Sequence, residues 1–139
     1  MKRVEAVFRP ERLEHVAAAL DGAGFHGFTI TDARGHGRSA ERTGEWRGVP
    51  FDMLVTHKLA IAVITEDGEV DAVVGAIARG ASTGEVGDGL ITVSDLVGVY
   101  SIRAHSPVAT RTVTADGPTT ATTTATPSRG HRTAGRTAG

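Results

Sequence analysis

Residues 83–90 read T-G-E-V-G-D-G-L, a stretch whose composition suits a phosphate-binding turn. Glycine loses more conformational entropy on ordering than any other residue, so a glycine cluster needs a structural or functional reason. Successive backbone N–H groups at Gly87, Asp88 and Gly89 could form a nest for phosphate oxygens. By itself, however, the stretch is more typical of a turn that ends a helix, because glycines commonly mark turns.

A second candidate for phosphate contact lies at residues 35–38. Gly35 and Gly37 would let the backbone approach a ligand closely. Arg38 carries a planar guanidinium group that matches phosphate geometry. An isolated arginine is more often solvated, but the two adjacent glycines favour ligand contact.

Two further cations have two interpretations each. Lys58 precedes a buried strand, where it either binds an anion or guards a sheet edge against aggregation. Arg103 either contacts an anionic ligand or forms a salt bridge. The residues alone leave both pairs of interpretations open.

The hydrophobic pattern predicts the elements that must position these residues. Apolar residues with a spacing of two predict strands, and a spacing of three or four predicts helices. Pro10 is suited to the first turn of the first helix, and Gly22 and Gly24 to its end. The predicted strands are 4–8, 25–33, 59–64 and 90–93, with a short edge strand at 97–103, and the predicted helices are 10–21 and 70–81.

The order strand-helix-strand, long loop, strand-helix-strand indicates an α+β fold of the split-βαβ, ferredoxin-like type. Such a fold has a four-stranded antiparallel sheet with two helices on one face. Not all of the apolar strand residues can lie under two helices, and a large exposed apolar face is a liability in a monomer. We therefore expect self-association to bury the other face. The residues considered for this are Val7, Phe28, Ile30, Ile61, Val63, Ile91 and Val93.

The polar segment between the second and third strands, about 20 residues long, is predicted to be a functional loop. Around it, six motifs occur in a fixed order: R-P, G-x-T-I-T, R-G-x-G-R, W-R-G, a lysine before the third strand, and T-G-x-x-G-D-G. In this order and spacing the chain resembles the P-II signal-transduction family, known from nitrogen metabolism. The resemblance covers nearly all of residues 1–104.

The resemblance implies a non-enzymatic regulator that assembles as a homotrimer. It implies ATP, ADP or AMP bound in clefts between subunits, and a loop at 37–56 that inserts into a target such as an ammonium channel, an enzyme or a transcriptional regulator. Residues 83–90 then become the phosphate loop. The implied nucleotide-binding residues are Thr29, Gly35, Gly37, Arg38, Val63, Ile64, Gly87, Asp88, Gly89 and Arg103.

The resemblance also assigns an effector-anion site. Lys58 matches the family lysine that pairs with a carboxylate of 2-oxoglutarate. Ser39 stands where the family usually has a glutamine that helps to hold Mg²⁺ and 2-oxoglutarate, and its hydroxyl has a shorter reach.

Three other positions depart from the family pattern. Leu90 and Ser101 replace cations, so we expect a relative preference for ADP or AMP over ATP. Phe51 replaces the tyrosine that many bacterial members modify, and Phe has no hydroxyl, so modification there is excluded. Tyr100 lies outside the loop and is no substitute.

The loop contains candidate contacts for a target protein, namely Trp46, Arg47 and Phe51. Aromatic residues in such a loop either become buried by loop folding or serve as anchors for a partner. We favour the anchor interpretation.

Composition restricts the class of protein. Residues 1–106 hold 11 Lys/Arg against 15 Asp/Glu, a balance of −4, which argues against nucleic acid as the main partner. There is no cysteine, and the spacing of the six histidines matches no compact metal-ligand pattern. The charged start Met1–Pro10 shows no export signal, so a cytoplasmic protein is expected. Residues 1–106 are predicted to form one domain, and residues 107–139, rich in Thr, Ala, Gly and Arg, to form a disordered tail.

Three alternatives remain. The first is a specialised P-II paralogue that senses ADP or AMP with another small anion, linked to inorganic carbon or metal efflux. The second is an acyl-phosphate hydrolase using Arg38 and a loop amide, although Asp88 and Lys58 are the only acid–base candidates. The third is a structural trimer whose pocket binds nothing.

Overall fold

The computed structural model describes residues 1–37, 43–52, 54–111 and 121–122. It divides into two units, Met1–Leu96 and Val97–Gly139. The first unit holds the helices and the main sheet, and the second holds a separate three-stranded sheet.

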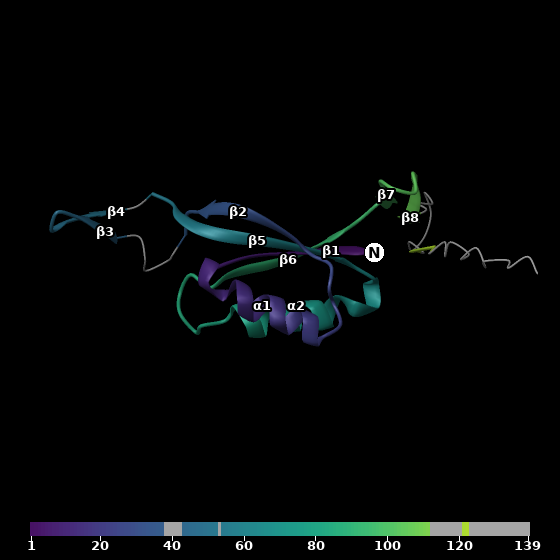
Figure 1. Ribbon diagram of the computed structural model, residues 1–139, viewed down its shortest axis with the longest axis horizontal. Helices are drawn as coiled ribbons and strands as arrows, with labels where there is room; N and C mark the ends of the chain where they lie inside the picture. The colour runs from purple at the N-terminus through teal and green to yellow at the C-terminus, as the bar shows by residue number, and fades with distance from the viewer. Residues whose placement is uncertain (38–42, 53, 112–120, 123–139) are drawn as a thin grey trace, which may run out of the picture. The chain divides into compact units, whose positions relative to one another are not determined.

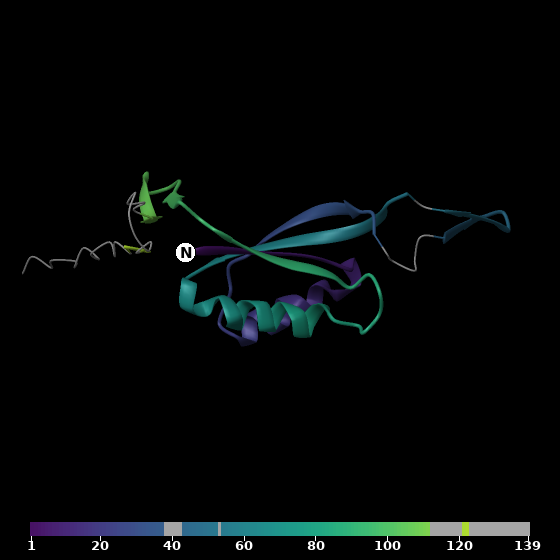
Figure 2. The ribbon, with the colours of Figure 1, turned by 180° about the vertical axis from the view of Figure 1, so that it is seen from behind.

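Four strands of the first unit form an antiparallel sheet, with two helices on one face (Figure 1). The strands are β1 (Lys2–Phe8), β2 (Thr29–Gly35), β5 (Thr56–Thr65) and β6 (Gly89–Asp95), in the spatial order β2-β5-β1-β6. The helices are α1 (Leu13–Gly22) and α2 (Val70–Ala81), preceded by the 3₁₀ turns η1 (Pro10–Arg12) and η3 (Asp67–Glu69). The reverse view in Figure 2 shows both helices on the same side of the sheet. This arrangement is the predicted split-βαβ, ferredoxin-like fold.

Local sequence signals explain where the helices begin and end. Pro10 opens η1, where its missing N–H costs no hydrogen bond. Glu66 and Glu69 form a reciprocal capping box at the start of η3. Gly24, with φ 88°, follows the end of α1 in the left-handed region that favours glycine.

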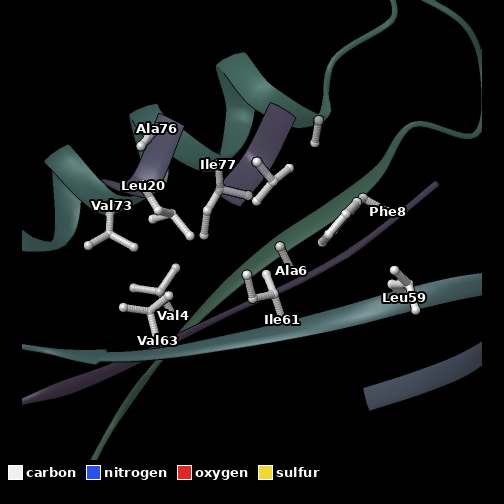
Figure 3. Close-up of a cluster of buried hydrophobic side chains, with 12 residues drawn as sticks. Val4, Ala6, Phe8, Leu20, Leu59, Ile61, Val63, Val73, Ala76 and Ile77 are labelled. Carbon is white, nitrogen blue, oxygen red and sulfur yellow. The ribbon is translucent and has the colours of Figure 1, made fainter. Parts of the chain in front are cut away.

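The core lies between the sheet and the helices (Figure 3). Alternate residues of β1, namely Val4, Ala6 and Phe8, point toward the helices and are buried. Ile61 on β5 and Ile77 on α2 meet them there and are fully buried. Each such large aliphatic side chain contributes roughly 1.5–3 kcal/mol by its burial, so this layer dominates the stability of the unit.

Strand register corrects the expectation of a large apolar face opposite the helices. Val4 pairs with Val63 and Val93, and Ala6 pairs with Ile61 and Ile91, so these residues share the helix-covered face. Of the strand residues considered, only Val7 falls on the uncovered face. That face carries the aliphatic residues Val7, Ile64 and Leu90 among small, polar and charged ones, namely Arg3, Glu5, Thr29, Thr31, Ala60 and Ala62. The expectation was wrong because several adjacent strands direct their apolar residues to the same side.

The polar composition of the long segment predicts a loop without regular structure. Part of it instead forms strands. Strands β3 (Thr43–Trp46) and β4 (Val49–Asp52) form an antiparallel hairpin. Its two-residue turn, Arg47 and Gly48, has φ values of 51° and 78°. Positive φ at both turn positions is the geometry that matches the twist of a tight hairpin.

Other strand boundaries also shift. β2 begins at Thr29 rather than at residue 25, since Phe25 and Phe28 pack against the core from the segment before it. β5 is longer than predicted and includes Lys58.

In the second unit, β7 (Gly98–Ser101) lies within the predicted edge strand. It pairs with β8 (Ser106–Arg111), which pairs with β9 (Ala121–Thr122). The structure therefore differs from the predicted disordered tail at 107–111 and 121–122. Residues 112–120 and 123–139 lie outside the described part of the chain.

Candidate functional site

The turn at residues 83–88, between α2 and β6, is organised around the carboxylate of Asp88. Its Oδ2 accepts hydrogen bonds from the backbone N–H groups of Thr83 at 2.8 Å and Gly84 at 3.0 Å. Its Oδ1 accepts from the Thr83 hydroxyl and from Arg9 Nε. These bonds, the Thr83 hydroxyl first among them, hold the pKa of Asp88 well below its usual range. Asp88 is thus an ionised organiser of the turn.

Arg9 is the buried partner of this turn, and the sequence-based site did not include it. Its Nε lies 3.2 Å from Asp88 Oδ1, and its Nη2 donates to the Val86 carbonyl at 2.8 Å. The side chain is almost fully buried, so its charge requires these partners. The available signal was the R-P dipeptide, which placed a charged residue directly after a buried strand.

Gly89 meets a steric limit that only glycine satisfies. Its φ is 112°, a conformation that side chains rarely adopt. A Cβ at this position would lie 1.7 Å from the Val7 carbonyl oxygen on the paired strand. Gly87 is also left-handed, with φ 98°. Left-handed residues on either side of Asp88 are compatible with an anion nest, which stays a prediction.

A hollow of about 400 Å³ lies beside this turn. The segment before the long loop lines it with Gly35, His36 and Gly37, and the segment after the loop lines it with Thr56 and Lys58. The turn and the adjacent strands supply the remaining lining residues: Val7, Glu85, Gly87, Asp88, Gly89 and Leu90. Five residues of the predicted nucleotide set, together with Lys58, therefore border one space.

Lys58 has a defined position in this hollow. It is buried, and its Nζ donates a 2.9 Å hydrogen bond to the Gly87 carbonyl. An ammonium group has three donors, so this bond leaves capacity for an anion beside it. The lysine therefore connects β5 to the turn and brings a cation to the wall of the hollow.

The residues assigned to adenine lie elsewhere in the same subunit. Thr29 and Ile64 border a separate shallow hollow on the uncovered face of the sheet, and Val63 is buried in the core. Val63 is five residues from Lys58 along β5, a separation of about 17 Å in an extended strand. One subunit thus keeps the two predicted halves of the nucleotide site apart.

Three other predicted residues cannot be placed in this site. Arg38 and Ser39 lie outside the described residues. Arg103 is an exposed residue of the second unit, which is described by itself.

The predicted target contacts lie on the β3–β4 hairpin. Trp46 pairs with Val49, and Gly44 pairs with Phe51, so these residues share one face of the hairpin. Trp46 is 69% exposed, and the Arg47 guanidinium lies 5.8 Å from the centre of its ring. The hairpin therefore presents an apolar face with a cation at its tip.

Two negative findings apply to the described ranges. No helix there is long and apolar enough to cross a membrane. No group of three or more His, Asp or Glu residues in those ranges is arranged to hold a metal ion.

Comparisons with known proteins agree on one family. The family model described as Nitrogen regulatory protein P-II matches residues 1–106. The chain is 42% identical to Nitrogen regulatory protein P-II 2 of Methanothermobacter thermautotrophicus over 103 residues, covering 74% of this chain and 90% of the relative. It is 41% identical to the P-II protein of Synechocystis sp., covering 74% and 92%. The crystal structure of Arabidopsis thaliana PII bound to citrate superposes with a TM-score of 0.61 at 29% identity, covering 76% of this chain and 83% of that one.

Proposed function

This chain belongs to the nitrogen regulatory protein P-II family, and on that premise we propose that it is a signalling regulator that binds an adenine nucleotide and controls a protein target through residues 37–56. The relatives are named as regulatory proteins rather than as enzymes. The default role is in nitrogen metabolism.

The main support for this proposal is the hollow beside the turn at residues 83–88. Its lining comes from both ends of the long loop, with Gly35 and Gly37 on one side and Thr56 and Lys58 on the other. A ligand there would contact both ends of the loop together. A ligand shifts a conformational equilibrium only by its different affinity for the two states, and contact with both loop ends is the proposed source of that difference.

The separation of the two half-sites supports a site shared between subunits. In the proposed homotrimer, the hollow of one subunit holds the phosphates, and Thr29, Val63 and Ile64 of the next subunit approach the adenine. The uncovered sheet face, with its small residues Ala60 and Ala62, is the surface proposed for the trimer contact.

A small anion is proposed as a second effector near Lys58. The Arabidopsis relative was crystallised with citrate, a carboxylate anion, which supports this class of ligand. For this chain 2-oxoglutarate is the first candidate, with Mg²⁺ near Ser39.

A specialised paralogue that prefers ADP or AMP is the second candidate function. Leu90, 62% exposed, lines the hollow with an apolar side chain, and Glu85 brings a carboxylate to it. Both residues disfavour a highly charged ligand. The Glu85 carboxylate repels phosphate, and apolar Leu90 cannot replace the water that solvates it.

Calorimetric titration with ATP, ADP and AMP, each with and without Mg²⁺ and 2-oxoglutarate, tests both candidates. We expect ADP or AMP to bind at least as tightly as ATP. Strong mutual enhancement between ATP and 2-oxoglutarate would instead overturn the specialised candidate, and no binding of any adenine nucleotide would overturn the nucleotide-sensing function.

Replacing residues 40–53 by a Gly-Ser linker of equal length tests the role of the loop. We expect nucleotide binding to persist and target binding to disappear, with an ammonium channel as the first target to examine because the family includes regulators of such channels. Undiminished target binding by the linker variant would overturn the loop mechanism.

A further inference from the structure

His36 connects the two ends of the long loop. Its Nδ1 lies 2.5 Å from the carbonyl oxygen of Leu54, which is 18 positions further along the chain. A carbonyl oxygen can only accept a hydrogen bond, so Nδ1 must carry a proton. The loop between these residues contains the β3–β4 hairpin.

The other ring nitrogen of His36 is available for a second contact. The side chain is exposed and lines the hollow with Lys58 and Gly87. Within the described ranges, Nε2 has no hydrogen-bond partner. With Nδ1 protonated, Nε2 is an acceptor in neutral histidine and a donor in the imidazolium form.

The described charged side chains around the hollow do not by themselves balance the charge of a phosphate ligand. Lys58 on β5 brings one positive charge, and Glu85 brings a negative one. The carboxylate of Asp88 is neutralised by Arg9 and bonded by Thr83. A phosphate group would therefore meet one ammonium and one opposing carboxylate among the described side chains that border the hollow.

We propose that His36 is an anion-binding residue of this site, which donates Nε2–H to a terminal phosphate oxygen of the nucleotide when its ring is protonated. This inference rests on the proposed nucleotide-binding function. In the imidazolium form the ring holds the Leu54 carbonyl and the phosphate together. In the neutral form the Nε2 lone pair faces the phosphate oxygen and opposes it.

Proton linkage follows from this arrangement. Imidazole is the side chain that changes charge between about pH 5 and pH 8. Because the phosphate contact needs the protonated ring, a ring that is neutral in the free protein takes up a proton on binding, so affinity rises as the pH falls. The same contact would fix the ring against Leu54 and so bias the ends of the loop.

The test is calorimetric titration of the full chain with ADP at about pH 6 and about pH 8, in buffers without phosphate. His36→Asn retains an amide that can replace Nδ1 toward Leu54 and removes the Nε2 donor. We expect it to bind ADP about tenfold more weakly than wild type near pH 6 and about equally near pH 8, since one charge-assisted hydrogen bond is lost. Changes in the ionisation of ADP itself cancel in this ratio.

Two further variants sharpen the test. His36→Gln places a neutral donor near the position of Nε2. The ratio of its ADP affinity to that of His36→Asn should therefore be the same at both pH values. His15→Asn alters an exposed histidine on α1 and should match wild type at both pH values. Proton uptake, measured from the binding heat in buffers of different ionisation enthalpy, should be larger in wild type than in either His36 variant.

An affinity ratio between wild type and His36→Asn that is the same at both pH values would overturn the role of His36 and leave nucleotide binding intact. Equal proton uptake in wild type and His36→Gln would overturn it as well. If no variant and no wild-type protein binds ADP at either pH, the proposed function fails and this inference fails with it.

Discussion

Arg9 Nε donates a 3.2 Å hydrogen bond to Asp88 Oδ1, joining the residue that follows β1 to the one that precedes β6. The two residues are 79 positions apart, and their pairing sets the shape of the turn that borders the hollow. The same guanidinium holds the Val86 carbonyl. The candidate site therefore depends on a contact between residues near the start and near the end of the first unit's sequence.

Removing either partner should loosen the turn and weaken ADP binding. We expect Asp88→Asn and Arg9→Gln each to lower the melting temperature and the ADP affinity, because each removes the charge-assisted contact between these two groups. The double variant should be less damaged than the sum of the single variants, since the two groups are coupled. Thermal unfolding and calorimetry measure both effects. Asp52→Asn, an exposed hairpin carboxylate, is the control, and strict additivity of the two changes would contradict the coupling.

Asp88 should also contribute to the pH dependence of stability. Its folded-state pKa is depressed, so its stabilising contribution is present above the ordinary aspartate pKa of about 4 and is lost as the pH falls below that value. We expect urea-unfolding free energies of wild type to decline between about pH 5 and pH 3. Asp88→Asn should show a shallower decline over the same range. An equal slope in the two proteins would contradict a dominant role for this carboxylate.

Substitution of Gly89 should be disruptive even by alanine. The added Cβ would overlap the Val7 carbonyl and sit on a left-handed backbone. We expect Gly89→Ala to lose about 3 kcal/mol of unfolding free energy in urea. Gly22→Ala, at the end of α1 with open space around it, is the matched control and should change stability by less than about 1 kcal/mol. Similar losses in the two variants would show that the close approach at Gly89 is not the cause.

Lys58→Met keeps the aliphatic stem of the side chain and removes its ammonium group. The Gly87 carbonyl would lose its donor, at a cost of about 1 kcal/mol, and the hollow would lose a cation. We expect ADP affinity to fall about tenfold or more in calorimetry. Lys2→Met is the control. It removes a cation at the end of β1 that lies far from Lys58 and should leave ADP affinity unchanged. Wild-type affinity in Lys58→Met would exclude this lysine from ligand binding.

Trp46 provides a direct optical probe of the loop because it is the only tryptophan in the chain. Its high exposure predicts emission typical of a solvated indole and efficient quenching by acrylamide. If ligand binding reorganises the ends of the loop, saturating ADP should change the quenching constant. Lys58→Met should suppress this change at the same ADP concentration, and an ADP-insensitive quenching constant in wild type with bound ADP would contradict coupling between the hollow and the hairpin.

The fold was predictable because its signals are local. Pro10, Gly24 and the spacing of Leu13, Val16 and Leu20 define the first helix without reference to distant residues. The hairpin was missed because its turn at Arg47 and Gly48 lies within a long polar segment whose glycines favour a loop. The glycines of residues 83–89 predict a turn, and only the order of the surrounding motifs makes it a candidate phosphate loop.

Side-chain partners across the domain were not predictable in the same way. The sequence gives no register between β1, β5 and β6, and a shift of one residue would move Ile61 and Val63 to the other face of the sheet. For this reason the uncovered face was assigned wrongly, and Arg9 was missed as the partner of Asp88.

The sequence by itself determined the order of the two helices and the four strands of the main sheet, the family and the identity of the glycines that border the hollow, since propensity, periodicity and motif spacing act over short stretches of chain. Only the tertiary structure decided that Asp88 organises its turn through Arg9, that Lys58 bonds the Gly87 carbonyl, and that His36 joins Leu54 across the loop. Those contacts depend on strand pairing, which brings groups far apart in the chain within hydrogen-bond distance, and no local pattern encodes that distance.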